Sequence, residues 1–362
     1  MALSSRTIFS GFALATSWTW CIGMFAPILM GQLFGWPGIL VFALPNIIGC
    51  ACFGYLRTAE RSRQETRDHA WVMGVFSAAT VAYQVFFAGW QWGPIVAEQF
   101  EASSNQGTAL VTGALFTASV LLAALPRHLL WPLAALAFPL SLLTFAFLPW
   151  GSMHAISARG AWTMGDLALV APTIVFGFLL SPNLDLTFHR ARQECHAGER
   201  PRNFAVFGVA FAAMLLLTTC YLAASPGGLN NPAVRAHMAI QLVMTCALHL
   251  SELRFLRLPV APRMLLGVGA GILGLIVALV EPGRDSYLRF LGLYGLLFPA
   301  YAALALRAKG RPTVRAALAV GVAVIAVTPI LDHAFLDRPT MLAPLAVVFP
   351  LVAIVLFTRR GR

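Results

Sequence analysis

Charged residues are scarce in this sequence. They make up 11% of its 362 residues, whereas about a quarter of an average soluble domain is charged. Hydrophobic residues make up 59% and the mean hydropathy is +0.77, which excludes a soluble globular fold. Since one bilayer crossing takes about 20 apolar residues, the length holds about 12 transmembrane helices and little else. We therefore expect an all-α membrane protein, with residues 1–362 forming a single polytopic domain.

Lysine is almost absent, because Lys309 is the only one in the chain. Without a G-x-x-x-x-G-K-[ST] motif anywhere in the sequence, a nucleotide-driven motor within the chain is excluded. No cluster of histidines shares one apolar span, which argues against haem or copper. The six cysteines suggest neither a disulfide framework nor a metal site. These absences predict a protein that is not an enzyme and that holds no metal and no cofactor.

Apolar runs bounded by charged residues, proline or glycine predict twelve spans. Their approximate ranges are 7–31, 36–56, 70–97, 107–125, 129–149, 163–188, 203–225, 233–253, 261–280, 286–306, 313–331 and 339–358. The loops then alternate in charge, and 20 of the 25 lysines and arginines fall on one side. The positive-inside rule predicts that both termini are cytoplasmic, in a plasma membrane or a bacterial inner membrane. The net charge of +11 follows from this bias and requires no nucleic acid as partner, only the lipid bilayer.

Two of the predicted spans are interrupted. The first carries polar residues, Gly23 and Pro27 in its middle. Pro27 has no N–H to donate to the carbonyl of Gly23, and a free carbonyl at membrane depth needs protein or a polar cavity around it. A simple proline kink explains this span equally well. The sixth span has a similar interruption at Gly177 and residues 181–183, followed by Asp185.

The two interrupted spans begin two successive units of five helices, and an odd number of helices makes such units inverted. Paired broken helices in inverted halves point to the binding site of a transporter. We expect a 5+5 inverted repeat, made of residues 7–149 and 163–307, with two extra helices in residues 312–358. The unwound segments are expected at residues 23–27 and 177–183.

Two stretches resemble the sodium/solute symporter family, which has the LeuT-type fold of the amino acid, polyamine and organocation superfamily. "ATSWTWCIGMFAPILMGQLFGWPG", residues 15–38, resembles the first core helix, and "GFLLSPNLDLTFHRARQ", residues 177–193, resembles the sixth. In that family two adjacent hydroxyls of the eighth core helix help to hold sodium. Here Thr245 is followed by Cys246, so the coupling ion can be Na+ or H+, or coupling can be missing.

Polar and aromatic residues of the interrupted spans and of spans three and eight are the candidate site. For substrate binding we expect Trp18, Thr19, Trp20, Gly23, Gln84, Asn183 and Asp185. For ion coupling we expect Cys21, Asp185, His189, Gln241 and Thr245. Asp185 and His189, four residues apart, share a helix face and are either functional or a solvated ion cluster at the headgroups. Gln241, Thr245 and His249 form a polar stripe, which lines a permeation path or joins helices structurally.

Together these features predict a secondary transporter that moves a small organic solute by alternating access, coupled to an ion or to protons. The alternative is a transporter-like membrane sensor or accessory protein that binds a solute without net transport.

Overall fold

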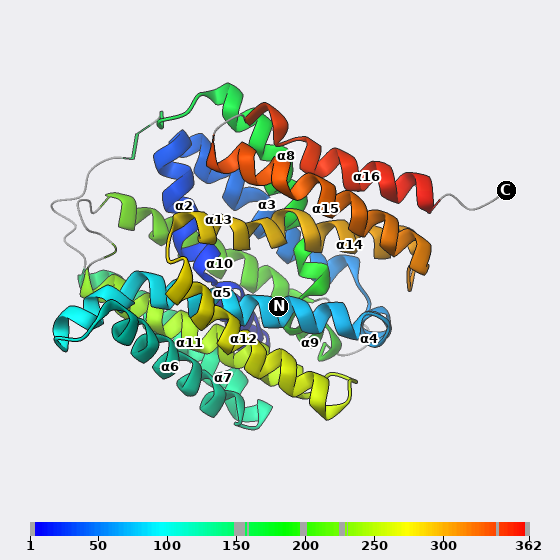
Figure 1. Ribbon diagram of the computed structural model, residues 1–362. Coiled ribbons are helices and arrows are strands. Elements are labelled where there is room, and N and C mark those ends of the chain that lie inside the picture. The colour runs from blue at the N-terminus through cyan, green and yellow to red at the C-terminus, as the bar shows by residue number, and fades with distance from the viewer. Residues whose placement is uncertain are drawn as a thin grey trace.

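A computed structural model describes residues 4–147, 156, 157, 159–195, 201–223, 229, 231–337 and 340–358. Within these residues the chain is helical and contains no strand (Figure 1), which confirms the all-α class. Eleven helical segments are long and apolar enough to cross a membrane, and one bent pair of helices makes a twelfth. The chain is therefore a multi-pass membrane protein. The expected span limits 149, 225 and 339 lie outside the described residues.

The helices follow the predicted spans closely. The first six spans correspond to α1 (Ser5–Trp18) with α2 (Cys21–Phe34), α3 (Trp36–Leu56), α5 (Ala70–Gln99), α6 (Ser104–Ala123), α7 (Arg127–Leu143) with η1 (Thr144–Phe147), and α8 (Met164–Leu180) with η3 (Ser181–Leu184) and α9 (Leu186–Gln193). The other six are α10 (Arg202–Ala223), α11 (Pro232–Arg254), α12 (Val260–Val280), α13 (Arg284–Gly292) with η5 (Leu293–Leu297) and α14 (Phe298–Ala308), α15 (Val314–Leu336), and η6 (Thr340–Leu342) with α16 (Leu345–Phe357).

One short helix was not predicted. This is α4 (Ala59–Asp68), which is polar throughout and packs against α9. Its first turn is capped by Thr58, whose hydroxyl accepts a hydrogen bond from the Arg61 amide at 3.1 Å. A hydropathy scan cannot detect α4, because this polar helix does not cross the membrane and contains no apolar run. The charged run after the second span therefore forms structure and is more than a loop.

The break in the first span lies earlier than expected. The chain leaves α1 at Thr19, Trp20 precedes α2, and the two helices are bent by 62°. The expected unwinding at residues 23–27 is wrong, because this segment is helical and Pro27 lies inside α2. The Thr19 hydroxyl donates to the carbonyl of Ala15 at 2.7 Å, so a polar side chain competes with the helix at this point. In the sixth span the 3₁₀ turn η3 and the extended Asp185 interrupt the helix, later than the expected start at residue 177.

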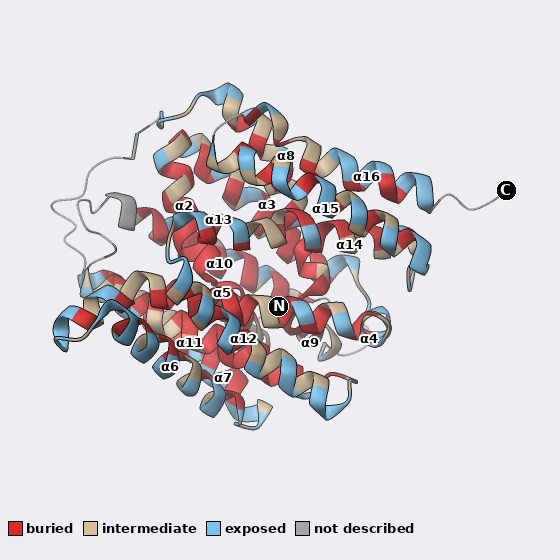
Figure 2. Cartoon of the chain, in the orientation of Figure 1, coloured by how far each residue is buried: buried red, intermediate tan, exposed pale blue. Residues whose placement is uncertain are grey.

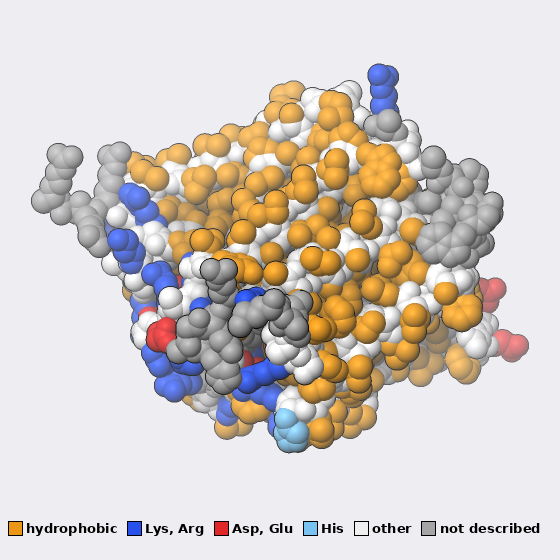
Figure 3. Space-filling model, turned by 180° about the vertical axis from the view of Figure 1, so that it is seen from behind, with side chains coloured by type: hydrophobic (Ala, Val, Ile, Leu, Met, Phe, Trp, Pro, Cys, Tyr) orange, Lys and Arg blue, Asp and Glu red, His pale blue; other side chains and the backbone are white. Residues whose placement is uncertain are grey.

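The middle of the bundle is formed by α1, α5 and α11, whose residues are largely buried, and Figure 2 shows this for α5 and α11. In contrast, α12 and α15 have broad exposed faces that carry large apolar side chains such as Leu265 and Ile325. Figure 3 shows a wide hydrophobic surface on one face of the molecule, with most Lys and Arg side chains gathered at one edge. This distribution is what a lipid-facing surface requires.

The start of α1 and the ends of α9, α14 and α16 lie on the same side of the bundle. Arg6 donates to the carbonyl of Glu194 at 3.3 Å, and Arg307 donates to the Thr358 hydroxyl at 3.4 Å. The helix α4 packs on α9, and its Asp68 lies 3.5 Å from Arg311 just beyond α14, which joins the two pairs on one side. The two ends of the described chain therefore share a side, and its assignment as cytoplasmic stays a prediction.

Candidate functional site

The break between α1 and α2 exposes backbone groups inside the bundle. Carbonyls at the end of a helix have no donor within the helix and need another partner. At the end of α1 the Thr16 carbonyl accepts from the Thr19 amide at 3.3 Å, and the Thr245 hydroxyl of α11 adds a closer donor, 2.8 Å from the carbonyl oxygen of Thr16 and 3.3 Å from that of Thr19. All three residues are fully buried. Thr245, one of the residues proposed from the sequence, therefore joins α11 directly to the break.

The first turn of α2 is held from the opposite direction. The Cys21 amide donates to Oε1 of Gln84, from α5, at 2.9 Å. The Cys21 carbonyl accepts from the Tyr287 hydroxyl of α13 at 3.3 Å. Gln84 was expected at the site, whereas Tyr287 was missed. The sign that could have revealed Tyr287 is a tyrosine within an apolar span. Backbone donors and acceptors of one segment are thus matched by side chains from three different helices.

Asp185 lies in the sixth span, at the interruption between η3 and α9, and faces α1 and α11. It caps the N-terminus of α9, where its Oδ1 accepts from the amide and from the hydroxyl of Thr187, both at 2.7 Å. The Thr187 hydroxyl also lies 2.9 Å from that of Ser17 in α1. Asp185 Oδ2 faces His249 Nε2 of α11 at 3.8 Å. Since both side chains are fully buried, the headgroup alternative for Asp185 is wrong.

His189, the expected partner of Asp185, is occupied elsewhere. Its Nδ1 lies 2.9 Å from the hydroxyl of Ser62 in α4, and its Nε2 lies 3.0 Å from the carbonyl oxygen of Asn183. Asp185 precedes α9, so the two side chains do not share a face of one helix as predicted. His189 therefore links α9 to α4, and it is His249 that faces Asp185.

Aromatic rings cover the break. The Trp18 indole donates to Oδ1 of Asn46, from α3, at 2.6 Å. The rings of Trp18 and Trp20 lie 4.5 Å apart, and Trp20 also contacts Tyr294 at 5.0 Å and His249 at 5.7 Å between ring centroids. The two tryptophans thus lie at the break, and Tyr294 extends the aromatic layer toward α13.

A layer of polar and charged residues closes the α4 side of the bundle. We define this charged layer as Arg57, Ser62, Glu65, Asn183, His189, Arg192 and Gln193. Arg57 donates to Asn183 Oδ1 at 2.6 Å and to Glu65 at 3.1 Å, and its carbonyl accepts from Arg192 at 2.6 Å. Gln193 donates to the Ser62 hydroxyl at 3.1 Å. Asn183 thus belongs to this layer and not to the break.

Beside the charged layer, Glu252 joins three helices. It is almost fully buried near the end of α11, and its Oε2 lies 2.9 Å from Arg127 Nη2 of α7 and 3.3 Å from Arg190 Nε of α9. The Arg127 guanidinium also lies 3.5 Å from the ring centroid of Phe255. A carboxylate buried between two cations is satisfied electrostatically, so this cluster holds α7, α9 and α11 together.

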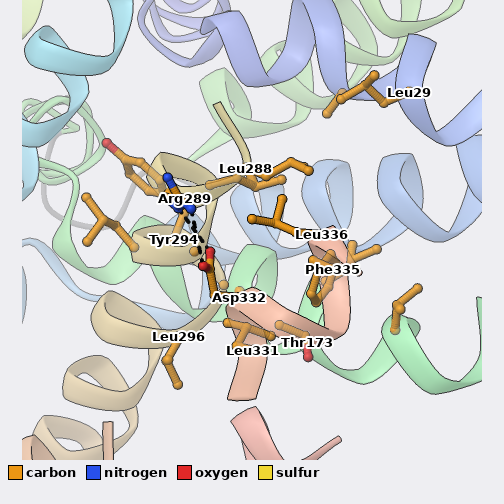
Figure 4. A pocket seen from close by; sticks show the side chains of 18 of the residues that line it. Leu29, Thr173, Leu288, Arg289, Tyr294, Leu296, Leu331, Asp332, Phe335 and Leu336 are labelled. Atoms are coloured by element: carbon orange, nitrogen blue, oxygen red, sulfur yellow. Dashed lines mark hydrogen bonds and ion pairs between the residues drawn. The ribbon is translucent and has the colours of Figure 1, made fainter. Parts of the chain in front are cut away.

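In the half of the bundle away from α4, a cavity of about 440 Å³ lies between α2, α8, α13, η5 and α15. Its wall is mainly aliphatic and aromatic, with Tyr294 and an ion pair of Arg289 with Asp332 at 3.2 Å (Figure 4). None of the residues that the sequence suggested for the site lines this cavity. Tyr294 contacts Trp20, so these two rings separate the cavity from the break.

The predicted residues therefore divide into two groups. Trp18, Thr19, Trp20, Cys21, Gln84, Asp185 and Thr245 gather around the break. Gly23 faces Phe211 and Met214 of α10, and the Gln241 amide donates to the Ser141 hydroxyl of α7 at 2.6 Å. Gly23, Asn183, His189 and Gln241 are thus directed away from the break. Among the described residues, no group of three His, Cys, Asp or Glu side chains is placed to hold a metal ion.

The fold and the site define a polytopic all-α membrane protein with a broken span inside its core. No family model matches the chain, and no curated protein matches it. Among solved structures, the chain is similar to a manganese transporter of Eremococcus coleocola, crystallised with an aromatic bis-isothiourea substituted compound. The two share 13% identity over 97% of this chain and 92% of the other, with a TM-score of 0.49.

Proposed function

We propose that this chain is a secondary transporter that moves a small organic solute by alternating access, coupled to an ion or to protons. The observation that carries the proposal is the α1–α2 break, whose backbone groups at Thr16, Thr19 and Cys21 are met by side chains of α5, α11 and α13. Interrupted helices supply such groups to substrates and ions inside membranes. A fold that only packs helices gains nothing from unwinding a span, because each freed backbone group must find a new partner.

The two sides of the break differ in a way that supports alternating access. The charged layer closes the α4 side, whereas the opposite half contains the 440 Å³ cavity. This volume lies within the range of about 300–1,000 Å³ that small-molecule sites occupy. In this proposal the solute enters through the cavity, passes Tyr294 and Trp20, and binds at Trp18, Thr19, Gln84 and the residues around Asp185. The charged layer opens in the alternate state, and its excess of arginine supports a cytoplasmic position.

Helix packing supports the inverted repeat of residues 7–149 and 163–307. Under that relation α1 corresponds to α8, α3 to α10, α5 to α11, α6 to α12, and α7 to α14. The contact of α1 with α10 then corresponds to that of α8 with α3, and the contact of α5 with α12 to that of α11 with α6. The contacts of α1 with α7 and of α8 with α14 form a third pair. The remaining helices, α15 and α16, pack on each other and on α14, as two helices outside the repeats would.

Solute depletion tests the proposal directly. Cells that express the chain are compared with vector controls in a medium containing a defined mixture of amino acids, nucleobases, organic acids and organic cations. We expect at least one solute class to disappear faster from the medium of the expressing cells. Equal depletion of every solute contradicts transport. A solute that raises the melting temperature of the purified protein but is not depleted supports the sensor alternative instead.

A reversible cross-link then tests alternating access. Gln193 and Ser62 touch across the α4–α9 contact, so cysteines at both positions, with Cys195 replaced by serine, can be joined by a short bifunctional thiol reagent with a cleavable disulfide. Cross-linking should stop uptake of the depleted solute, and reduction should restore it. Each single cysteine variant is the control. Undiminished uptake in the cross-linked protein contradicts opening of the charged layer.

A further inference from the structure

Asp185 and His249 present one unpartnered atom each to the same place. Asp185 Oδ2 and His249 Nε2 lie 3.8 Å apart, and neither makes a hydrogen bond of good geometry among the described residues, although the Ser17 backbone lies beside the His249 ring. The other end of each side chain is fixed. Asp185 Oδ1 accepts twice from Thr187, and His249 Nδ1 lies 3.2 Å from the Ser77 hydroxyl of α5. Both side chains are therefore oriented by their neighbours so that their free atoms face each other.

Such an arrangement is costly unless it has a use. A buried polar atom without a partner loses its hydration and gains nothing in return, and an ionisable group inside a membrane protein usually has a functional role. One proton bound by the pair removes both deficits, because it makes the pair electrically neutral and lets a side-chain shift of about 1 Å close the 3.8 Å gap to hydrogen-bond distance. Without that proton, the carboxylate and a neutral imidazole together carry one negative charge.

The groups around Asp185 and His249 are mostly polar or aromatic, and few of them can ionise. Asp185 interacts electrostatically with three further titratable groups, from α3, α9 and η5: Cys50, His189 and Tyr294. The α1 segment contributes the backbone and hydroxyl of Ser17 and the ring of Trp20, and α5 contributes Ser77. Of the three titratable groups, His189 has both ring nitrogens engaged by Ser62 and Asn183. The pair is thus surrounded by hydroxyl, thiol and aromatic groups.

We propose that Asp185 and His249 form a single proton-binding site, in which one proton is held between Asp185 Oδ2 and His249 Nε2. A hydronium ion or water gives up the proton, a new O–H or N–H bond forms within the pair, and the net charge changes from −1 to zero. The role of this proton in driving transport rests on the proposed function, whereas its binding does not.

The pair is placed to communicate its charge to both interrupted spans. Asp185 begins α9 and is linked through Thr187 to Ser17 in α1. His249 contacts the Trp20 ring, which separates it from Tyr294 and the cavity. Loss or gain of the proton changes the attraction between α9 and α11 directly beside the α1–α2 break. The site thus deepens the proposed function by naming the group that binds the coupling ion.

Nuclear magnetic resonance of the purified full-length protein in detergent tests the site without any solute. Histidine nitrogens and aspartate carboxyl carbons are isotope-labelled, and the signals of His249 and Asp185 are assigned from the variants H249Q and D185N. Spectra are recorded over a pH range that brackets the ordinary pKa values of both groups, about 3.9 and 6.5. We expect the two signals to change together, with one shared midpoint. Separate midpoints, or no change over the whole range, overturn the proposal.

The variants make the test specific. D185N should weaken proton binding at His249 at least tenfold, whereas H69Q, which alters a histidine that lies 2.9 Å from the Tyr301 hydroxyl and whose charged neighbours are Asp68, Glu65 and Arg311, should leave the shared midpoint in place. An unchanged His249 midpoint in D185N overturns the proposal. If D185N does not fold, Thr187→Val removes one donor to Asp185 Oδ1 and should strengthen proton binding about tenfold, which is one pH unit. An unmoved midpoint in this variant also overturns the site, whereas absence of solute uptake affects only the transport proposal.

Discussion

Replacing Thr245 with valine tests whether α11 fixes the break in the first span. The substitution keeps the size of the side chain and removes the hydroxyl that serves the carbonyls of Thr16 and Thr19. Hydrogen bonds between membrane helices contribute about 0.6 kcal/mol on average and up to about 1.7 kcal/mol. Here one buried hydroxyl serves two carbonyls at an unwound segment. We therefore expect Thr245→Val to lower the free energy of unfolding by about 1–2 kcal/mol.

The matched control is Thr112→Val. Thr112 is equally buried, but its hydroxyl donates to the carbonyl of Thr108 in its own helix at 2.8 Å. That carbonyl already has a helical amide as donor, so the cost should be under about 0.5 kcal/mol. Unfolding of the purified variants by sodium dodecyl sulfate in mixed micelles measures both, and Thr245→Ser should recover most of the loss. If Thr245→Val costs no more than Thr112→Val, the break is not held by α11 and our account of the site is refuted.

Two further substitutions test packing away from the break by the same unfolding assay. Glu252→Gln removes the buried charge 2.9 Å from Arg127 and should lower the free energy of unfolding by about 2–4 kcal/mol. The control Glu281→Gln, at an exposed ion pair, should lower it by less than about 0.5 kcal/mol. Equal losses would argue against the buried cluster. Gly177→Ala would place its new carbon 2.7 Å from a backbone carbonyl of η5 and should cost about 1–3 kcal/mol, whereas Gly321→Ala meets open space and should be neutral or stabilising. A neutral Gly177→Ala would contradict the close approach of α8 to η5.

The membrane spans could be predicted because the property that defines them is local. A run of about 20 apolar residues signals a span whatever the rest of the chain does, so α3 and α5 have nearly the bounds that hydropathy gave. The helix α4 has no such signal. Its sequence Ala59–Asp68 is uniformly polar, and its position is determined by contacts with α9 that lie more than 120 residues away in the sequence.

The place of the break shows a similar limit. Proline was a reasonable signal, since it removes one helical hydrogen bond, yet α2 continues through Pro27. The helix ends at Thr19, where the side chain bonds to Ala15 and the backbone is met by Thr245 of α11. Competition between a side chain and the helical backbone breaks the helix only when another helix supplies hydrogen-bond partners for the freed backbone groups. That information lies in the tertiary contacts and not in residues 15–27.

The burial of Asp185 depends on its neighbours more than on its depth along the span. A straight helix of 22 residues from Asp166 rises about 33 Å at 1.5 Å per residue and reaches the headgroups near residue 187. The headgroup alternative followed from that arithmetic. It fails because α9, which begins after Asp185, packs against α1, α5 and α11 and is covered by the polar helix α4, through the contact of Ser62 with His189. A polar helix that no hydropathy signal reveals thus covers α9, and the neighbouring helices leave Asp185 fully buried and 3.8 Å from His249.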